Sequence, residues 1–85
     1  MAQREWVHKY FTIREFSPAP KRKTCTYVLA NSSTDSILGA IKWYGPWRQF
    51  TFQPMAGTVW NDDCLEIIGD FLGKLNHDYR NGGTQ

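Results

Sequence analysis

The chain has 85 residues, of which 41% are hydrophobic and 15% aromatic, and its formal net charge at pH 7 is +2. This length has room for one domain with one core, and the composition is too apolar for a disordered chain. No stretch approaches the roughly 20 apolar residues of a membrane-spanning helix, and the N-terminus has no apolar run typical of signal peptides. We therefore expect a cytoplasmic protein that makes no contact with a membrane.

Charge is distributed unevenly along the chain. Residues 1–54 contain eight Lys and Arg against three Asp and Glu, whereas residues 55–85 contain two against five. The sequence therefore has a basic front part and an acidic back part.

The first two thirds of the chain have the pattern of β-strands. Residues 5–16 are rich in aromatic and β-branched types that alternate with period two, which predicts a first strand. Further strands are predicted at 24–30, 37–44 and 47–53, separated by polar residues or by Gly45-Pro46. Because these connections are too short for parallel crossovers, we expect an antiparallel meander.

One helix is predicted at about 62–77. Asn61 is a good N-cap, Asp62 and Asp63 favour the first turn, and Asn76 can close the helix. Apolar side chains recur every three or four residues and form one stripe: Cys64, Leu65, Ile68, Phe71, Leu72 and Leu75. Gly69 and Gly73 mark a narrow side, which indicates close packing on the sheet or a smooth surface for a partner.

The predicted fold class is α+β, an antiparallel three- to four-stranded β-meander packed against one C-terminal α-helix. Residues 24–78 form its core. Residues 1–23, the first strand and a Pro-containing basic loop, belong either to the fold or to its periphery, and residues 79–85 are expected to be a flexible tail.

The densest group of binding-type residues surrounds Gly45-Pro46. Strand alternation puts Phe50 and Phe52 on the face toward the helix and leaves other rings on the uncovered face. Cations among aromatic rings can neutralise phosphates and stack bases, or they can form a protein-binding hot spot. Alternatively, Trp43 and Trp47 pack as a cross-strand pair that only stabilises the hairpin. The candidate binding residues are Lys42, Trp43, Tyr44, Trp47, Arg48, Arg14, Lys21, Arg22 and Lys23.

No pattern indicates catalysis. His8 and His77 lie at opposite ends without a companion ligand, and the serines of residues 32–36 lack the glycine frame of a nucleophile. Cys25 and Cys64 have no metal-type spacing, so we expect buried free thiols. We therefore expect no enzymatic activity, no metal or other cofactor and no small-molecule substrate.

Residues 25–76 resemble a family of small uncharacterised proteins of phages and prophages. The resemblance rests on Leu38-Gly39, Ile41-Lys42-Trp43-Tyr44, Trp47-Arg48, Phe50, Phe52 and Pro54, followed by Asn61, Asp62, Leu65 and Ile68. It implies a phage origin and places the protein in the cytoplasm of a bacterial host, but it implies no activity. Three antiparallel strands on a C-terminal helix also look like the sheet-type DNA-binding domains of some integrases and plant transcription factors.

The leading hypothesis is a non-enzymatic module that binds nucleic acid, DNA in particular, through a basic aromatic face of the sheet. The alternative is a protein-binding module, for a host factor or a second copy, that uses the same aromatic hairpin. Affinity for nucleic acid should fall steeply with salt, whereas affinity for a protein anchored by apolar rings should depend on it weakly.

Overall fold

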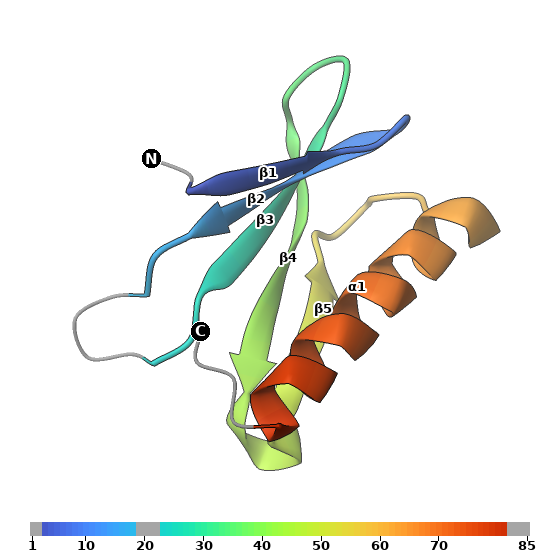
Figure 1. The fold of residues 1–85 in the computed structure, drawn as a ribbon. Coiled ribbons are helices and arrows are strands. Elements are labelled where there is room, and N and C mark those ends of the chain that lie inside the picture. Colours follow the sequence, from blue (N-terminus) through green and yellow to red (C-terminus); the bar gives the residue numbers. More distant parts are fainter. Residues whose placement is uncertain (1–2, 19–22, 82–85) are drawn as a thin grey trace.

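The computed structural model describes residues 3–18 and 23–81, in which five strands precede one helix (Figure 1). The elements are β1 (Arg4–Val7), β2 (Phe11–Phe16), β3 (Thr26–Asn31), β4 (Ile37–Tyr44), β5 (Gln49–Pro54) and α1 (Asp62–Arg80). Every strand pairs antiparallel with its neighbours in the sequence, so the order in the sheet is β1-β2-β3-β4-β5. The predicted α+β class, a meander followed by a helix, is confirmed, with five strands in place of three or four.

The additional strand arises because the segment predicted as one strand is a hairpin. The N–H of His8 donates to the carbonyl of Phe11 at 2.9 Å, and Lys9 and Tyr10 form the turn between them. The turn contains no Gly, Asn or Asp, which are the usual sequence signals of a tight hairpin. The pattern of residue types therefore gave no indication of it.

The hairpin also changes which residues of this segment share a face. Across the two strands an even-numbered residue pairs with an odd-numbered one, for example Trp6 with Ile13. Trp6 consequently faces the helix, where its ring lies 5.0 Å from that of Phe71, whereas Val7 is 74% exposed. Period-two alternation along one continuous strand over residues 5–16 would put Val7 on the same face as Ile13, and the hairpin rules this out.

The core lies between the sheet and α1, which crosses one face of the sheet (Figure 1). Phe11 and Ile13 of β2 are fully buried, so this part of residues 1–23 belongs to the core and not to a periphery. Phe50 is buried and Phe52 packs against the core, as predicted. The other buried members of the core are Cys25, Tyr27, Leu29, Ile41, Cys64 and Ile68.

The helix begins where predicted and ends later. The side-chain Oδ1 of Asn61 accepts a hydrogen bond from the N–H of Cys64 at 2.8 Å, which confirms the N-cap. The helix runs beyond Asn76 to Arg80, so Tyr79 and Arg80 belong to it and not to a flexible tail. Residues 82–85 of the predicted tail lie outside the described residues.

Asn76 has a different role from the predicted helix end. Its Oδ1 accepts from the N–H of Phe50 at 2.7 Å, and its Nδ2 donates to the carbonyl of Phe50 at 3.3 Å. The amide therefore takes both backbone groups that an additional strand would use at this point of β5. An edge strand with free backbone groups can pair with a strand of another chain. Here a side chain of the helix blocks such pairing at Phe50.

The two helical glycines do not serve close packing. A Cβ built on Gly69 or Gly73 meets nothing within 4 Å, so the predicted narrow contact with the sheet is wrong. Gly39 of β4 is the position where space is short, because a Cβ there would lie 2.9 Å from Cε1 of Phe52 and 3.0 Å from the carbonyl oxygen of Gln53.

Gly69→Ala is expected to raise the free energy of unfolding by about 0.5–1 kcal/mol, since alanine restricts the unfolded chain and favours the helix. Gly39→Ala, the matched substitution at a crowded position, is expected to lower it by about 1–3 kcal/mol, in the range of other overpacked sites. Urea unfolding of both variants measures the difference. Destabilisation by Gly69→Ala would show that this side of the helix is covered.

Candidate nucleic-acid interface

The candidate residues of the β4–β5 connection lie at one end of the sheet. Gly45–Trp47 forms a 3₁₀ turn with Pro46 in its first positions, and the N–H of Arg48 donates to the carbonyl of Gly45 at 3.1 Å. Arg48 closes the turn in the left-handed conformation, with φ 50° and ψ 48°. Strand β5 therefore begins at Gln49. The predicted strand at 47–53 starts too early, because Trp47 and Arg48 belong to the turn and do not follow strand alternation.

The ring of Trp43 packs against other rings at this end of the sheet and does not project into solvent. It pairs with Phe50 across the two strands and so lies on the face toward the helix, where it is half-buried. Its ring centroid lies 5.4 Å from that of Phe50 and 4.5 Å from that of Tyr79. The predicted packing of Trp43 against Trp47 does not form, since Trp47 packs edge-on against Tyr44 at 5.3 Å.

Two shallow grooves flank the Trp43–Tyr79 pair. One has a volume of about 390 Å³, and its other lining residues are Lys23, Thr24, Thr26 and Lys42. The second has a volume of about 550 Å³, and its other lining residues are Gly45, Arg48 and Arg80. Side chains from residues 23–26, from the β4–β5 hairpin and from the last turn of α1 thus converge on one pair of rings in contact, tilted by 42° to each other.

The charge at this end is positive. Lys23, Lys42, Arg48 and Arg80 are exposed, and within residues 3–18 and 23–81 none of them forms an ion pair. Neither groove has a carboxylate among its described lining residues. An anion that enters either groove therefore meets ammonium and guanidinium groups that are not engaged by any carboxylate of the described ranges.

Two further rings stand on the surface at the same end. Trp47 is 66% exposed and Tyr44 is 40% exposed, and their rings are perpendicular to each other. Tyr44 shares the open face of the sheet with Lys42, two positions earlier on β4. We call the eight residues together the basic aromatic end: Lys23, Lys42, Trp43, Tyr44, Trp47, Arg48, Tyr79 and Arg80.

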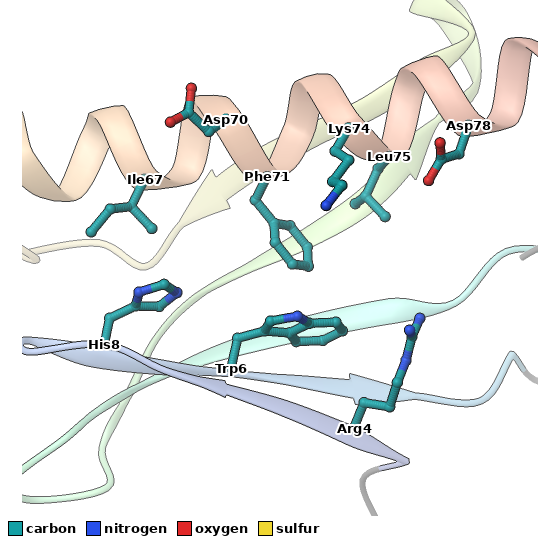
Figure 2. A pocket seen from close by; sticks show the side chains of 9 residues that line it. All are labelled: Arg4, Trp6, His8, Ile67, Asp70, Phe71, Lys74, Leu75 and Asp78. Atoms are coloured by element: carbon teal, nitrogen blue, oxygen red, sulfur yellow. The ribbon is translucent and has the colours of Figure 1, made fainter.

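A groove of a different character lies between β1 and α1 (Figure 2). It has a volume of about 440 Å³ and contains none of the predicted binding residues. Its inner surface is formed by apolar side chains such as Trp6, Phe71 and Leu75, and charged groups of both signs lie along its rim. It is therefore unsuited to bind a phosphate backbone.

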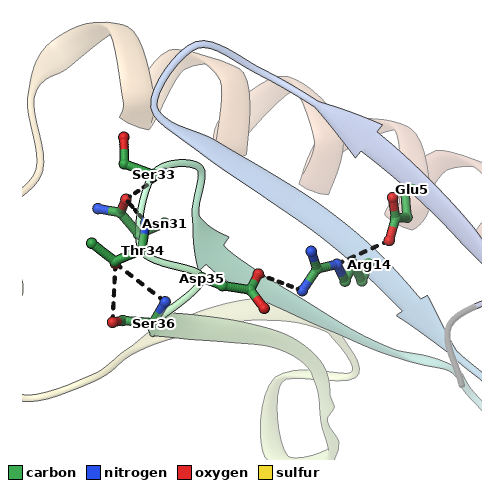
Figure 3. Close-up of polar contacts among 7 residues, drawn as sticks. All are labelled: Glu5, Arg14, Asn31, Ser33, Thr34, Asp35 and Ser36. Carbon is green, nitrogen blue, oxygen red and sulfur yellow. Dashed lines mark hydrogen bonds and ion pairs between the residues drawn. The ribbon is translucent and has the colours of Figure 1, made fainter.

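Arg14 does not join the basic aromatic end. Its guanidinium lies 2.9 Å from a carboxylate oxygen of Glu5 and 2.8 Å from one of Asp35 (Figure 3). The hydrogen bonds to Asp35 and Glu5 raise the pKa of Arg14 above its ordinary value. Because two carboxylates surround one guanidinium, this part of the open face is not basic, and the predicted basic sheet face is wrong in this respect.

The structure brings together five of the candidate residues that were predicted around Gly45-Pro46, and Lys23 with them. Lys21 and Arg22 lie outside the described residues. Sequence reasoning missed Tyr79 and Arg80, because it ended the helix too early. A signal was present: Tyr79 follows Leu72 and Leu75 at seven and four residues and so continues the apolar stripe.

Cys25 and Cys64 are free and buried, as predicted, and burial raises the pKa of the Cys25 thiol. In the described part of the chain, no three His, Cys, Asp or Glu side chains come close enough together to hold a metal ion. The same residues contain no helix long and apolar enough to cross a membrane.

Fold and site together define a small α+β protein in which a five-stranded antiparallel meander, covered on one face by one helix, presents a basic aromatic end. Its sequence is 34% identical over 56 residues to the uncharacterised 9.3 kDa protein of Acholeplasma phage L2. The aligned residues make up 66% of this chain and 72% of that protein. The chain belongs to the same family of small uncharacterised phage proteins. No family model and no solved structure matches it.

Proposed function

We propose that this phage-type protein is a non-enzymatic module that binds nucleic acid, with DNA as its leading target, through the basic aromatic end. The observation that carries the proposal is the convergence of four cations, from three separate parts of the chain, on the Trp43–Tyr79 pair, with no ion pair to any carboxylate of the described residues. The run Trp43-Tyr44-x-x-Trp47-Arg48 supplies half of this end.

The physical argument concerns both parts of a nucleotide. Lys and Arg neutralise phosphates and release bound counterions, which supplies most of the affinity for any nucleic acid. Exposed rings supply surfaces on which bases stack. The grooves are open and lined by cations without carboxylates, which suits an extended anionic chain better than an enclosed small molecule.

The double variant Lys42→Glu/Arg48→Glu tests the proposal. Fluorescence anisotropy of a labelled oligonucleotide at low salt is expected to show an affinity at least about tenfold lower than that of the unmodified protein. The slope of log affinity against log salt is expected to fall by about 0.7–0.9 for each phosphate that the variant no longer neutralises.

Lys9→Glu/Lys74→Glu is the matched control, because it changes the net charge by the same amount at exposed lysines outside the basic aromatic end. It is expected to lower affinity much less. Equal losses in both double variants would show that only net charge matters. Absence of binding by the unmodified protein at low salt would remove the proposal, and affinity for a protein that is insensitive to salt would favour the alternative function.

Trp47→Ala is expected to reduce affinity for a single-stranded oligonucleotide by about 5- to 150-fold, the range for loss of one base–ring stack, with a smaller effect on a duplex whose bases are already stacked. Since Trp47 is 66% exposed, the midpoint of urea unfolding should change little. Tyr10→Ala removes an exposed ring at the opposite end of the sheet and is the control. Equal effects of the two substitutions would contradict a stacking role for Trp47.

A further inference from the structure

The two edge strands of the sheet, β5 and β1, differ in what lies against their outer backbone groups. At β5 the side-chain amide of Asn76 occupies the N–H and the carbonyl of Phe50. At β1, the terminal strand at the other edge, no strand of the described residues pairs on the outer side, and α1 packs on the face of the sheet through contacts such as Trp6–Phe71. The β5 edge is therefore blocked at Phe50, whereas the described residues place no such group against the outer side of β1, which is open to an additional strand.

The register shows which backbone groups of β1 are open. The hairpin turn pairs His8 with Phe11 through a hydrogen bond, and hydrogen-bonded pairs alternate with other pairs along an antiparallel ladder. Trp6 therefore bonds toward β2, whereas the backbone groups of Glu5 and Val7 point away from the sheet. An incoming strand would form its backbone hydrogen bonds with Glu5 and Val7. One of its residues would then lie opposite Trp6.

The groove described above lies directly beside this open edge. In Figure 2, Arg4 and Trp6 of β1 and His8, which follows it, project toward α1, and the side chains of Phe71 and Leu75 point back at them. Because side chains of neighbouring strands on one face lie side by side, an added strand would present alternate side chains to this groove. Its volume of about 440 Å³ has room for such side chains.

Charge defines the chemistry of the occupant further. Arg4 is engaged by Glu15, at 2.8 Å, so its charge is already balanced. The remaining ionised groups on the rim are Asp70 and Asp78 against Lys74. A strand with Lys or Arg on either side of a central apolar residue, two positions away in each direction, complements that excess of carboxylates.

A second copy of this chain fits the groove less well. Its β1 would direct Arg4 and Trp6 to the groove, followed by His8, and these residues already line the groove of their own molecule. We therefore propose that the β1 edge and the β1–α1 groove bind an extended segment of a partner protein by strand addition, with an apolar side chain in the groove and basic side chains on either side.

The probe is the heptapeptide Thr-Lys-Thr-Leu-Thr-Lys-Thr with blocked ends, together with versions that carry Val or Phe in place of Leu. Titration to millimolar concentration is followed by the amide NMR signals of the protein. At least one peptide is expected to shift the signals of Glu5, Val7 and Phe71 and to slow exchange of the Val7 amide. The version with Ser in place of Leu is expected to shift them less.

Asp70→Lys is expected to weaken this binding at least about threefold. Glu66→Lys, an equal charge change on an exposed helix residue that does not line the groove, is expected to leave it unchanged. Equal effects, shifts confined to other surfaces, or no shift with any of the three peptides would overturn the proposal. Formation of a dimer through β1 in sedimentation would instead assign the edge to a second copy. None of these outcomes bears on binding at the basic aromatic end.

Discussion

Phe50→Ala is expected to lower the free energy of unfolding by about 3–5 kcal/mol, the usual cost of emptying an aromatic core site. Phe50 is 2% exposed, and its ring lies between those of Trp43, Tyr27 and Tyr79, at 5.4, 6.3 and 6.3 Å. Removal of the ring deletes these edge-on contacts and leaves a cavity at the junction of sheet and helix. A small domain has only about 5–15 kcal/mol of stability, so this loss is a large share of it.

Urea unfolding at low temperature measures the loss. Phe50→Leu is the control, because it retains most of the buried volume and is expected to cost considerably less. A loss under about 0.5 kcal/mol in Phe50→Ala would show that the helix covers the opposite face of the sheet. The substitution should also weaken nucleic-acid binding, because the ring of Phe50 packs against Trp43, which lines both grooves.

Arg4→Met is expected to lower the free energy of unfolding at neutral pH, because it leaves the buried carboxylate of Glu15 without its cation. Glu15 is 4% exposed and receives hydrogen bonds from Nε and from a terminal nitrogen of Arg4, at 3.0 and 2.8 Å. The hydroxyl of Tyr27 donates a further hydrogen bond to it at 3.1 Å. The head group of Arg4 is largely exposed, which keeps the cost below that of a fully buried pair.

The pH dependence provides an independent measurement of the same pair. Hydrogen bonds from Arg4 hold the pKa of Glu15 below its ordinary value, although burial acts in the opposite direction. A lowered pKa in the folded state contributes stability above the unfolded value of about 4.3, and this contribution is lost as pH falls through the folded pKa. In Arg4→Met that acid-dependent loss should shrink. Unchanged acid unfolding in the variant would contradict a stabilising role for the pair.

Local patterns predicted several elements of the fold. The N-cap at Asn61, the apolar stripe of the helix and the inward face of Phe50 depend on neighbours within a few positions along the chain, which a sequence displays directly. The candidate site was recovered in part for the same reason. Lys42, Tyr44 and Arg48 surround one turn, and residues close in sequence at a tight turn are necessarily close in space.

Other features depend on which segments meet, and local patterns do not contain that information. The turn at Lys9-Tyr10 lacks turn-type residues, so only the pairing of β1 with β2 shows that Trp6 faces the core. Arg14 is an ordinary cation in the sequence and loses that character only because the fold brings Glu5 and Asp35 to it.

By itself, the sequence determined the α+β class, the antiparallel order of the strands and the start of the helix, since each follows from residue periodicity and short connections. Only the tertiary structure decided which charged side chains form ion pairs and which cations lie close to one another. It neutralises Arg14 in the basic front part of the chain and brings Arg80 from the acidic back part to Arg48. The physical reason is that ion pairing depends on distance in space, which strand register and helix length set.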